Sequence, residues 1–593
     1  RGKVIVPASA GSGKTTVMIE KIVRLIISGT DVKEILAVTF TKKAAAQMKE
    51  KLRKELIKAI NSPETSPAVR AALKKQLAEV PSADISTIHS FCSKLIRSHF
   101  FAAGVDSDFS VIAEDDADGT KLKNDALDEV FEEAYEKGEE NFLRLLSVYW
   151  RKKSDNRLRG ILFDTYSALR MRADYRTFLT ENAAFTEEKF NLIVERLFSK
   201  LKEKCMYYAS RAEREKTYFE DIGREKSKNN AEEVLSALSA LLSASDYFSA
   251  CALPCPGFSA KERAKKDDTE EVSSHIAALA EIRDKVKGIF SENAEVLSRE
   301  EELAAYLSSG KIAESLTEYL LRFDEKYGEL KRERGLLDYN DLEHIALELL
   351  SVPAVAEEIK QKYRHVFVDE YQDVNPVQER ILSAVGGENV FLVGDIKQSI
   401  YGFRGSKSVF FAEKQSRFEA EEDASSLYLT RNFRSADAVL EAVNAQFLLA
   451  MTKENSDVDY AGGSFMERGG RYASDSGRVQ IHILSKEKEK KEQEKRGIYS
   501  VEAGYLKERA KASAYAKQIR HIIESERNAR WFDADEGVFK RVEYSDIAVL
   551  SRKKNGRITE VISALSEEGI PVTASAAVNI CDYPEVKALY DIL

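Results

Sequence analysis

Cysteine is scarce in this sequence, and long apolar runs are missing. Five cysteines are spread over 593 residues, and only Cys251 and Cys255 lie close together. No second pair completes a four-ligand metal site, so ordinary reduced thiols are the favoured interpretation. No apolar run reaches the roughly 18 residues of a membrane span, and no signal-peptide pattern opens the chain. These absences predict a cytoplasmic protein without a membrane partner.

A surplus of positive charge is also missing. The formal net charge is −9 at pH 7, which argues against a general basic coat for nucleic acid. An acidic body can still carry a local basic groove, so composition leaves nucleic-acid binding open. With 43% apolar and 32% charged residues, the chain is globular, and its length suggests roughly four domains.

Strands and helices alternate at the start of the chain, which predicts a parallel sheet. The expected elements are a strand at 3–9, a helix at 13–28, a strand at 34–40, a helix at 42–56 and a strand-to-helix turn at 83–96. From about 115 to 335, apolar residues recur at helical spacing and strand signals almost vanish. We therefore expect an all-helical insertion within an α/β domain.

Strand signals resume after the helical segment. Apolar runs at 365–370 and 390–395 predict two further strands of the first sheet. A strand at 425–430 is expected to open a second α/β unit, with later strands at 477–484, 544–552 and 570–575 and a helix at 503–526. The charge run at 485–496 favours a solvated loop. The predicted domains are 1–114 and 336–423 (first α/β domain), 115–335 (helical insertion) and 424–593 (second α/β domain).

The segment ASAGSGKTT follows a predicted strand and opens a predicted helix, the setting of a phosphate-binding loop. Gly11 and Gly13 let backbone N–H groups turn toward phosphate oxygens, and the helix N-terminus adds partial positive charge. Lys14 would reach the β and γ phosphates of ATP, and the Thr15 hydroxyl would bind Mg²⁺. The strict pattern has glycine where Ala8 stands. The predicted ATP-binding residues here are Ala8, Ser9, Ala10, Gly11, Ser12, Gly13, Lys14, Thr15 and Thr16.

Two carboxylates follow the buried strand predicted at 365–370. Ligands of open α/β sheets bind at the carboxyl ends of the strands. There Asp369 would hold Mg²⁺, and Glu370 would orient and deprotonate the attacking water. An acidic strand end is common by chance, so the assignment depends on the phosphate-binding loop. The strands that precede Lys14 and Asp369 are then expected to be neighbours in one sheet, which independently makes the helical segment an insertion.

Two segments combine aromatic and basic side chains. In VGDIKQSIYGFRGS (393–406), Tyr401, Phe403 and Arg404 follow a strand end within a polar stretch, which favours a flat binding partner. In LTRNFRS (429–435), Phe433 suits stacking on a base, and Arg434 suits a phosphate. The alternative for Arg434 is a helix-start residue paired with a carboxylate. The loops at 38–48 and 86–92 suit single-strand phosphates and bases, although without context structural turns are the favoured explanation.

Taken in order, these segments resemble the successive motifs of superfamily 1 helicases of the UvrD/Rep/PcrA and RecB type. The segment LLDYNDL (336–342) resembles the one that re-enters the first motor domain, and 544–556 resembles one of the second. The likeness covers nearly the whole chain, although the helical insertion matches only in position and character. Within this superfamily, ASAGSGKT, FVDEYQDVNPVQ and the segment at 569–589 are most similar to the AddA family of helicase–nuclease subunits.

The resemblance implies RecA-like P-loop motor domains that use ATP and Mg²⁺ to move 3′-to-5′ along DNA from a duplex end. It also implies a nuclease for processing broken ends and an AddB-type partner in a heterodimer. Gln398 would sense the γ-phosphate, and Arg434 would stabilise charge in the transition state as the cleft closes. The implied single-strand contacts are Phe40, Thr41, Thr87, His89, Tyr401, Phe403 and Arg404, with Phe403 stacked on a base.

Departures from the family pattern limit which family residues and domains can be assigned to this chain. Phe433 stands where many relatives carry Tyr, a change that preserves stacking. The Gln that contacts adenine in this family is expected before residue 1, and the remaining motor motifs and the nuclease are expected beyond Leu593. We therefore expect an N-terminal fragment with a truncated second motor domain. Two alternatives stay open: a stand-alone repair helicase without a nuclease, and a P-loop ATPase that acts on a protein while the aromatics pack against a helix.

Overall fold

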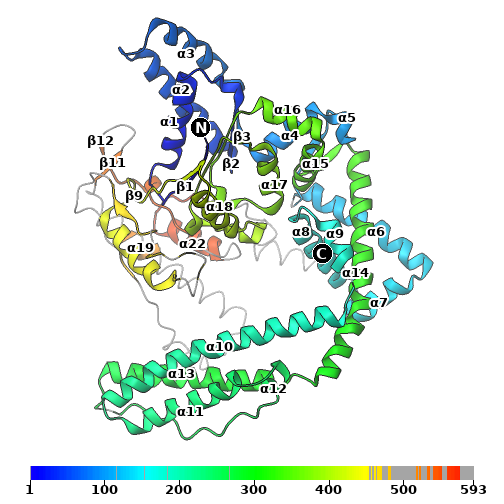
Figure 1. Cartoon of the computed structure of the whole chain (residues 1–593), viewed down its shortest axis with the longest axis vertical. Coiled ribbons are helices and arrows are strands. Elements are labelled where there is room, and N and C mark those ends of the chain that lie inside the picture. Colours follow the sequence, from blue (N-terminus) through cyan, green and yellow to red (C-terminus); the bar gives the residue numbers. More distant parts are fainter. Residues whose placement is uncertain are drawn as a thin grey trace.

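The computed structural model describes residues 2–452 except 115, 152–153, 183 and 266. Beyond Thr452 it describes 456, 458, 460–461, 464–469, 479–481, 516–518, 520–521, 530–533, 538–550 and 557–573. Figure 1 shows an α/β body from which a long helical arm extends. None of the helices within these residues is long and apolar enough to cross a membrane.

A six-stranded parallel sheet forms the centre of the α/β body, in the order β3-β2-β6-β7-β1-β8. The strands are β1 (Lys3–Pro7), β2 (Ile35–Thr39), β3 (Asp84–Thr87), β6 (His365–Val368), β7 (Val390–Gly394) and β8 (Ala424–Ser426). Every residue of β2 is buried, as expected for a strand covered on both faces. The predicted α/β fold with a parallel, helix-flanked sheet is confirmed.

Alternating side chains of the strands build two cores, one on each face of the sheet. Val6 and Ala37 pack toward helices α1 (Lys14–Ile27), α2 (Lys42–Asn61) and α3 (Pro67–Glu79). Ile5 and Leu36 pack toward the opposite layer. That layer contains α4 (Ile88–Ser98), α5 (Phe100–Ala103), α15 (Tyr339–Ser351), α16 (Pro353–Lys362), α17 (Pro376–Val385) and α18 (Ser408–Ala420). This arrangement fixes the carboxyl ends of all six strands at one edge.

The strand expected at 425–430 does not open a second unit. Instead, β8 pairs in parallel with β1 at the edge of the first sheet. The amides of Leu427 and Leu429 continue the contact by donating to the carbonyls of Ile5 and Pro7, each at 2.9 Å. The physical reason is that β1 has an open side next to the end of α18, and unpaired strand groups need partners.

The helical insertion leaves and re-enters the body at one point. Strand β4 (Ser110–Ile112) pairs in parallel with β5 (Leu336–Asp338), so both ends of the insertion meet there. The regular elements described between them are helices, as predicted. They are α6 (Ala117–Lys137), α7 (Glu140–Tyr149), α8 (Asn156–Arg170), α9 (Tyr175–Asn182), α10 (Glu187–Asp221), α11 (Glu225–Leu242), α12 (Tyr247–Cys251), α13 (Glu270–Asn293) and α14 (Arg299–Glu333).

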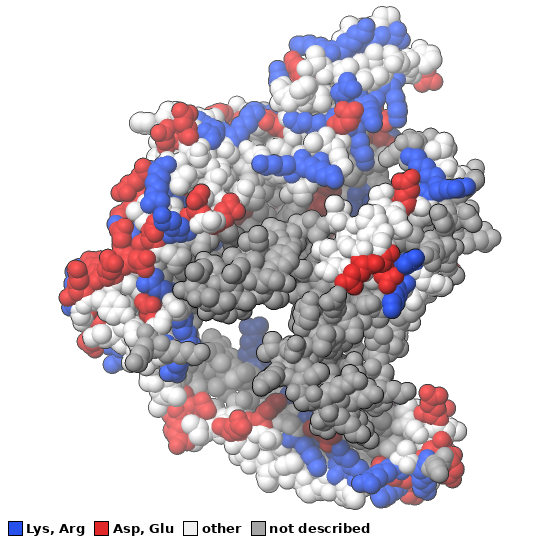
Figure 2. All heavy atoms as spheres, turned by 180° about the vertical axis from the view of Figure 1, so that it is seen from behind, with Lys and Arg blue, Asp and Glu red and all other residues white. Residues whose placement is uncertain are grey.

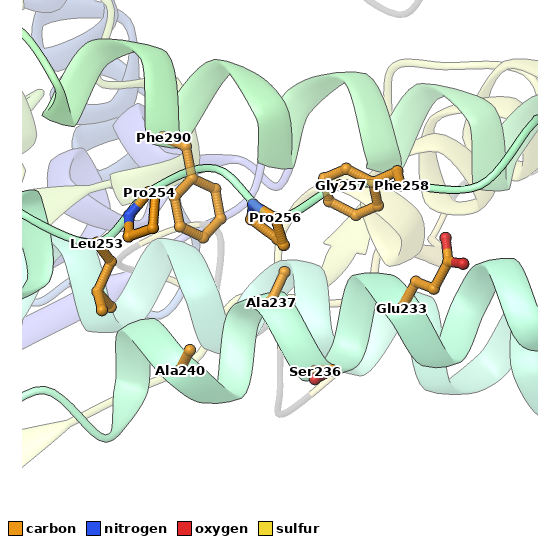
Figure 3. Close-up of a pocket in the computed structure, with 10 residues that line it drawn as sticks. All are labelled: Glu233, Ser236, Ala237, Ala240, Leu253, Pro254, Pro256, Gly257, Phe258 and Phe290. Atoms are coloured by element: carbon orange, nitrogen blue, oxygen red, sulfur yellow. The ribbon is translucent and has the colours of Figure 1, made fainter.

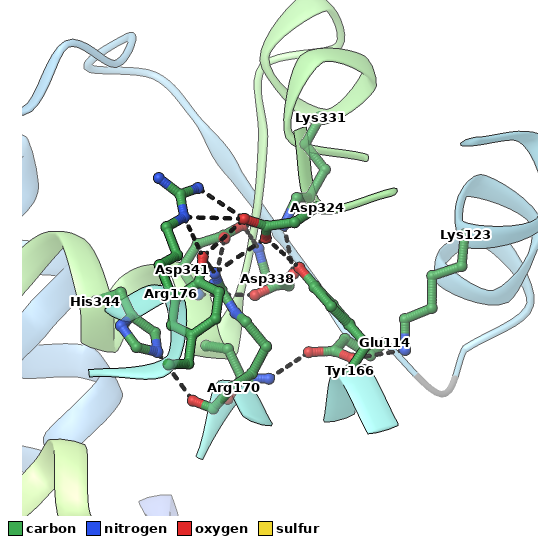
Figure 4. A network of polar contacts seen from close by, with 12 residues as sticks. Glu114, Lys123, Tyr166, Arg170, Arg176, Asp324, Lys331, Asp338, Asp341 and His344 are labelled. Atoms are coloured by element: carbon green, nitrogen blue, oxygen red, sulfur yellow. Dashed lines mark hydrogen bonds and ion pairs between the residues drawn. The ribbon is translucent and has the colours of Figure 1, made fainter. Parts of the chain in front are cut away.

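A buried charge network joins the insertion to the body (Figure 4). Lys331 of α14 forms an ion pair with Asp338 at 2.5 Å, and both side chains are almost inaccessible. Arg170 of α8 donates to Asp341 at 2.7 Å. Burial alone would raise the pKa of Asp338, but Lys331 and Arg170 hold it below its usual value. Since every buried charge here has an opposite partner, the network fixes how α8 and α14 meet the start of α15.

Beyond residue 430 the described elements are few. They are β9 (Arg431–Asn432), α19 (Asp437–Ala450), β10 (Glu467–Arg468), β11 (Arg530–Asp533), β12 (Val538–Arg541), a 3-10 turn at Tyr544–Asp546 and α22 (Arg557–Glu567). Strands were predicted at 544–552 and 570–575, but 547–550 and 570–573 have no regular structure. No partner strand lies beside them within the described residues. The charge run at 485–496, most of the strand at 477–484 and most of the helix at 503–526 lie outside the described residues.

Candidate functional site

The phosphate-binding loop connects β1 to α1 at the carboxyl edge of the sheet. Gly11 and Gly13 have φ angles of 67° and 87°, a left-handed conformation that glycine adopts without steric cost. The loop is held from both sides: the Ala8 amide donates to Gly394 at 2.9 Å, and the Ser9 amide donates to Leu429 at 3.0 Å. The loop geometry is therefore that of a phosphate cradle at a helix N-terminus.

One polar atom in this loop lacks a partner. The hydroxyl of Ser12 is buried and forms no hydrogen bond to another described residue. Thr15 is half-buried and Thr16 is exposed at the start of α1. Buried polar atoms are normally hydrogen-bonded, so the unpartnered Ser12 hydroxyl fits a loop that accommodates a polar ligand such as a phosphate chain.

The loop lysine contacts the predicted catalytic carboxylate. Lys14 Nζ lies 2.9 Å from Glu370 Oε2, although the residues are 356 positions apart. Glu370 has a φ angle of 53°, the one positive φ of a non-glycine residue in the described chain. Such a conformation costs on the order of 1–3 kcal/mol and persists where the surroundings impose it. The structure thus brings Lys14, Asp369 and Glu370 to one edge of the sheet. The prediction that their strands are neighbours was wrong, because β7 pairs with both β1 and β6 and lies between them.

Carboxylates outnumber cations at this edge. Partial burial and the Glu370 carboxylate raise the pKa of Asp369 to about 6. Burial and Glu370 likewise raise the pKa of Asp373 to about 6, with Lys14 opposing both shifts. Carboxylate oxygens are ligands that Mg²⁺ takes, so the chemistry of Asp369 fits a magnesium ligand, and Thr15 offers a hydroxyl at the start of α1. Groups of three or more His, Cys, Asp or Glu arranged around a metal position are absent from the described residues.

Gln372, which the sequence interpretation missed, links this centre to the next loop. Its Nε2 donates to Glu370 at 3.0 Å and to Asp373 at 3.2 Å, and its Oε1 accepts from the Asp395 amide at 2.8 Å. Asp395 in turn accepts from Gln398 Nε2 at 2.6 Å. The predicted phosphate sensor Gln398 is therefore hydrogen-bonded, through two residues, to the predicted catalytic carboxylate.

An aromatic cluster, defined here as Phe40, Tyr401, Phe403 and Arg404, lies beyond Gln398. The Phe40 and Tyr401 rings have centroids 4.6 Å apart, and Tyr401 lies 5.9 Å from Phe403. The guanidinium of Arg404 stands 5.7 Å from the Phe403 ring. Phe403 is 74% exposed, so the cluster presents a flat apolar surface to solvent.

The other predicted DNA-contact residues lie in different environments. Thr41 is exposed and caps α2 by accepting from the Ala44 amide at 3.1 Å. Thr87 is buried, and its hydroxyl caps α4 by accepting from the Ser90 amide. His89 is partly exposed and packs edge-on against Tyr339 at 4.9 Å. The structure therefore exposes Thr41 and His89 but gives Thr87 a capping position.

The segment at 429–435 docks on the phosphate-binding loop through Asn432. Asn432 Nδ2 donates to the Ala10 carbonyl at 2.8 Å, and its Oδ1 accepts from the amides of Arg434 and Ser435, each at 2.8 Å. The Phe433 amide donates to the Gly11 carbonyl at 2.8 Å. The exposed side chains of Phe433 and Arg434 therefore flank the loop. Sequence reasoning missed Asn432, which is 2% exposed; its place directly before Phe433 and Arg434 was the available signal.

Basic side chains gather at one end of the body. On the face shown in Figure 2, Lys and Arg concentrate on the projecting α2–α3 end. Helix α2 carries Lys42, Lys43, Lys49, Lys51, Arg53, Lys54 and Lys58. A protein of net charge −9 therefore has a local positive surface that begins one residue after Thr41.

A pocket of about 370 Å³ lies in the helical arm, away from the sheet edge (Figure 3). Leu253, Pro256, Phe258 and Phe290 are among its mostly apolar lining residues. Of the adjacent CALPC cysteines, Cys251 is buried and Cys255 is exposed, and both are free thiols. The pocket thus shares no residue with the predicted nucleotide or DNA positions.

Comparison with known proteins identifies consistent similarities. A model of the family described as "UvrD/REP helicase N-terminal domain" matches residues 1–419. A relative from Syntrophomonas wolfei subsp. wolfei is 30% identical over 650 residues, covering 100% of this chain and 51% of the relative. One from Alkaliphilus metalliredigens is 30% identical over 624 residues, with 100% and 49% coverage. A third, from Lactobacillus johnsonii, is 28% identical over 601 residues, with 97% and 49% coverage.

All three relatives are named as one subunit of an "ATP-dependent helicase/nuclease". The chain spans about half the length of these curated relatives.

Proposed function

Because this chain belongs to the UvrD/REP helicase family, whose model matches residues 1–419, we propose that it contains the ATP-driven motor of a DNA helicase. In this proposal it is the N-terminal part of a helicase–nuclease subunit that moves 3′-to-5′ along single-stranded DNA and processes broken duplex ends. The relatives' shared name, which makes each of them one subunit of a larger enzyme, supports a partner of the AddB type.

The contact between Lys14 and Glu370 is the observation that carries this proposal. Lys14 Nζ and Glu370 Oε2 lie 2.9 Å apart, which joins a phosphate-binding loop to a strand-end carboxylate. With a triphosphate in the loop, Lys14 would exchange Glu370 for phosphate oxygens. Glu370 would then be free to accept a proton from the attacking water.

The surrounding residues would divide the remaining work. Thr15 and Asp369 would hold Mg²⁺, which neutralises phosphate charge when it is bound. Gln398 would contact the γ-phosphate. Arg434 would contact it too, from the segment at 429–435 that Asn432 holds against the phosphate-binding loop. Phe433 would stack on the adenine base.

The aromatic cluster supports single-stranded DNA as the second ligand. Exposed rings with a neighbouring guanidinium suit base stacking, which tolerates any sequence. Phe403 would stack on a base, while Tyr401, Arg404, Phe40, Thr41 and His89 would line the same strand. Thr87 would act by capping the helix that carries His89.

The decisive experiment is ATP hydrolysis by the full-length protein with and without single-stranded DNA. We expect strong stimulation by single strands, together with oligonucleotide binding that weakens steeply between two salt concentrations. An ATPase rate indifferent to DNA, combined with salt-independent or absent binding, would instead favour a P-loop ATPase acting on a protein. A purified protein with helicase but no nuclease activity would favour a stand-alone repair helicase.

A further inference from the structure

A buried carboxylate connects the DNA-facing surface to the hydrolysis centre. Glu343 lies on α15, is 2% exposed, and faces three partners from two other elements. Its Oε1 accepts from Gln378 Nε2 at 2.6 Å and lies 2.9 Å from His89 Nε2; its Oε2 accepts from Asn375 Nδ2 at 3.0 Å. None of these partners is a lysine or arginine, so His89 is the one side chain among them that can carry positive charge.

The first connection leads to the hydrolysis centre. Asn375 and Gln378 form the capping box of α17, and Asn375 lies two residues after Asp373. Asp373 is hydrogen-bonded to Gln372, which also holds Glu370. The turn at Glu370–Asp373 therefore leads directly into the N-terminus of α17, which Glu343 contacts through Asn375 and Gln378. A shift of this turn on nucleotide binding would be transmitted to Glu343.

The second connection leads to the DNA surface. His89 stands in the first turn of α4, at the carboxyl end of β3, and its ring is one-third exposed. Glu343 occupies Nε2, which leaves Nδ1 as the ring nitrogen available to an external ligand. The Glu343 carboxylate can only accept hydrogen bonds, so it faces the ring through Nε2 and fixes the orientation in which His89 presents Nδ1. A phosphate oxygen placed there could accept from Nδ1–H.

We propose that Glu343 is a positioning residue that orients His89 toward a DNA phosphate and ties it to the turn behind Glu370, so that DNA stimulation of ATP hydrolysis depends on its carboxylate. The inference rests on the proposed function. It deepens that function by identifying a physical link between the two ligands, carried by a side chain that touches neither of them.

The main test moves the negative charge while keeping the hydrogen bonds. In the double variant Glu343→Gln with Asn375→Asp, the amide introduced at position 343 can donate to the carboxylate introduced at position 375. The amide oxygen at 343 can still accept from Gln378 and His89, and aspartate is also a good N-cap for α17. A purely structural Glu343 predicts a parental melting temperature and parental DNA stimulation in this variant.

Our inference instead predicts a parental melting temperature with a lower ratio of DNA-stimulated to DNA-free ATPase rates, reduced roughly 2- to 30-fold. The same loss is expected for His89→Ala, a partly exposed position that does not threaten folding. Adding Glu343→Gln to His89→Ala should lower the ratio little further, since both changes break one link. Glu348→Gln, an exposed change on the same helix, is the matched control and should leave the ratio unchanged.

Parental stimulation in the charge-moved variant, or in His89→Ala, would overturn the inference and leave the proposed function intact. Fully multiplicative effects of His89→Ala and Glu343→Gln would also overturn it. A parental protein that DNA does not stimulate would instead remove the proposed function, and this inference with it.

Discussion

At the nucleotide side of the sheet edge, Lys14, Glu370 and Gln372 are joined by hydrogen bonds of 2.9 and 3.0 Å in a largely enclosed turn. At the proposed DNA side, Phe403 and Arg404 are exposed and make ring contacts at more than 5 Å. The first group is fixed before any ligand arrives, because misplaced charges would be costly. In the second group, the face available for stacking is exposed to solvent. Under the proposed function, the residues assigned to hydrolysis are therefore pre-organised, whereas the surface assigned to DNA can adapt to any base.

Of the substitutions considered, Glu370→Gln is expected to have the largest effect, and that effect is on kcat. The amide keeps the shape of the side chain but cannot accept the proton of the attacking water, so kcat should fall roughly 10²- to 10⁴-fold. Binding of a nucleotide analogue and of single-stranded DNA should persist. Steady-state ATPase assays and equilibrium binding measure the two separately. Glu388→Gln, an exposed change, should match the parent; an unchanged kcat in the Glu370 variant would refute the assigned role.

Asn432→Ala tests whether the nucleotide side depends on fixed geometry. The change removes the partner of the Ala10 carbonyl and of the Arg434 and Ser435 amides. At about 1 kcal/mol for each buried group, the loss is roughly 3 kcal/mol. We expect a lower melting temperature and weaker nucleotide binding, measured by thermal unfolding with and without nucleotide. The exposed Asn61→Ala is the control, and equal behaviour of the two variants would contradict the role of Asn432 as a clamp.

Phe403→Ala tests the DNA side alone. Loss of one stacked base costs about 1–3 kcal/mol of binding free energy, so affinity for single-stranded DNA should fall roughly 5- to 150-fold. Nucleotide affinity should not change, because no hydrogen bond of the nucleotide centre involves this ring. Fluorescence anisotropy with a labelled oligonucleotide measures the effect. Phe101→Ala serves as control, since Phe101 is 91% exposed and lies on α5; parallel losses in both variants would mean that exposed rings act non-specifically.

The smallest expected effect comes from the burial of the Asp373 carboxylate and its repulsion by Glu370. Burial and Glu370 raise the pKa of Asp373 to about 6, above its usual 3.8. Its ionised form therefore destabilises the fold above pH 6, and this penalty fades as the pH falls toward 3.8. Asp373→Asn should stabilise the nucleotide-free protein by up to about 2 kcal/mol at pH 8 and very little at pH 4. Thermal unfolding across this range measures the difference, and a gain independent of pH would exclude the electrostatic cause.

Local patterns were enough to predict the centre of the fold. The strands β1, β2, β6 and β7 were expected within two residues of their observed bounds, because each is an apolar run that ends in polar motif residues. Lys14 and the Asp369–Glu370 pair could be assigned to one sheet edge because a parallel sheet aligns its strand ends, but the insertion of β7 between their strands was not predicted. The placement of β8 was wrong, since a strand pattern does not reveal which sheet has an open edge.

Residues that act through distant partners could not be predicted in this way. Asn432 binds a carbonyl 422 positions away, and Glu343 binds a histidine 254 positions away. In the sequence, Asn432 is a polar residue in a turn, and Glu343 is one charge on an amphipathic helix. Only the folded structure shows that both side chains are buried and that each joins different elements. The residues that hold a site together are therefore less visible than the residues that perform its chemistry.

The strand order of the sheet also has a consequence for biosynthesis. Strand β1 leaves the ribosome well before its two neighbours, β7 and β8, which begin at Val390 or later. At about 5–20 residues per second, the apolar strand would wait on the order of 20–80 s with both edges unpaired. The helical insertion, whose contacts are more local, can fold during that interval. An apolar strand with unpaired edges favours aggregation of the newly made chain, and slow translation through the insertion would prolong that exposure.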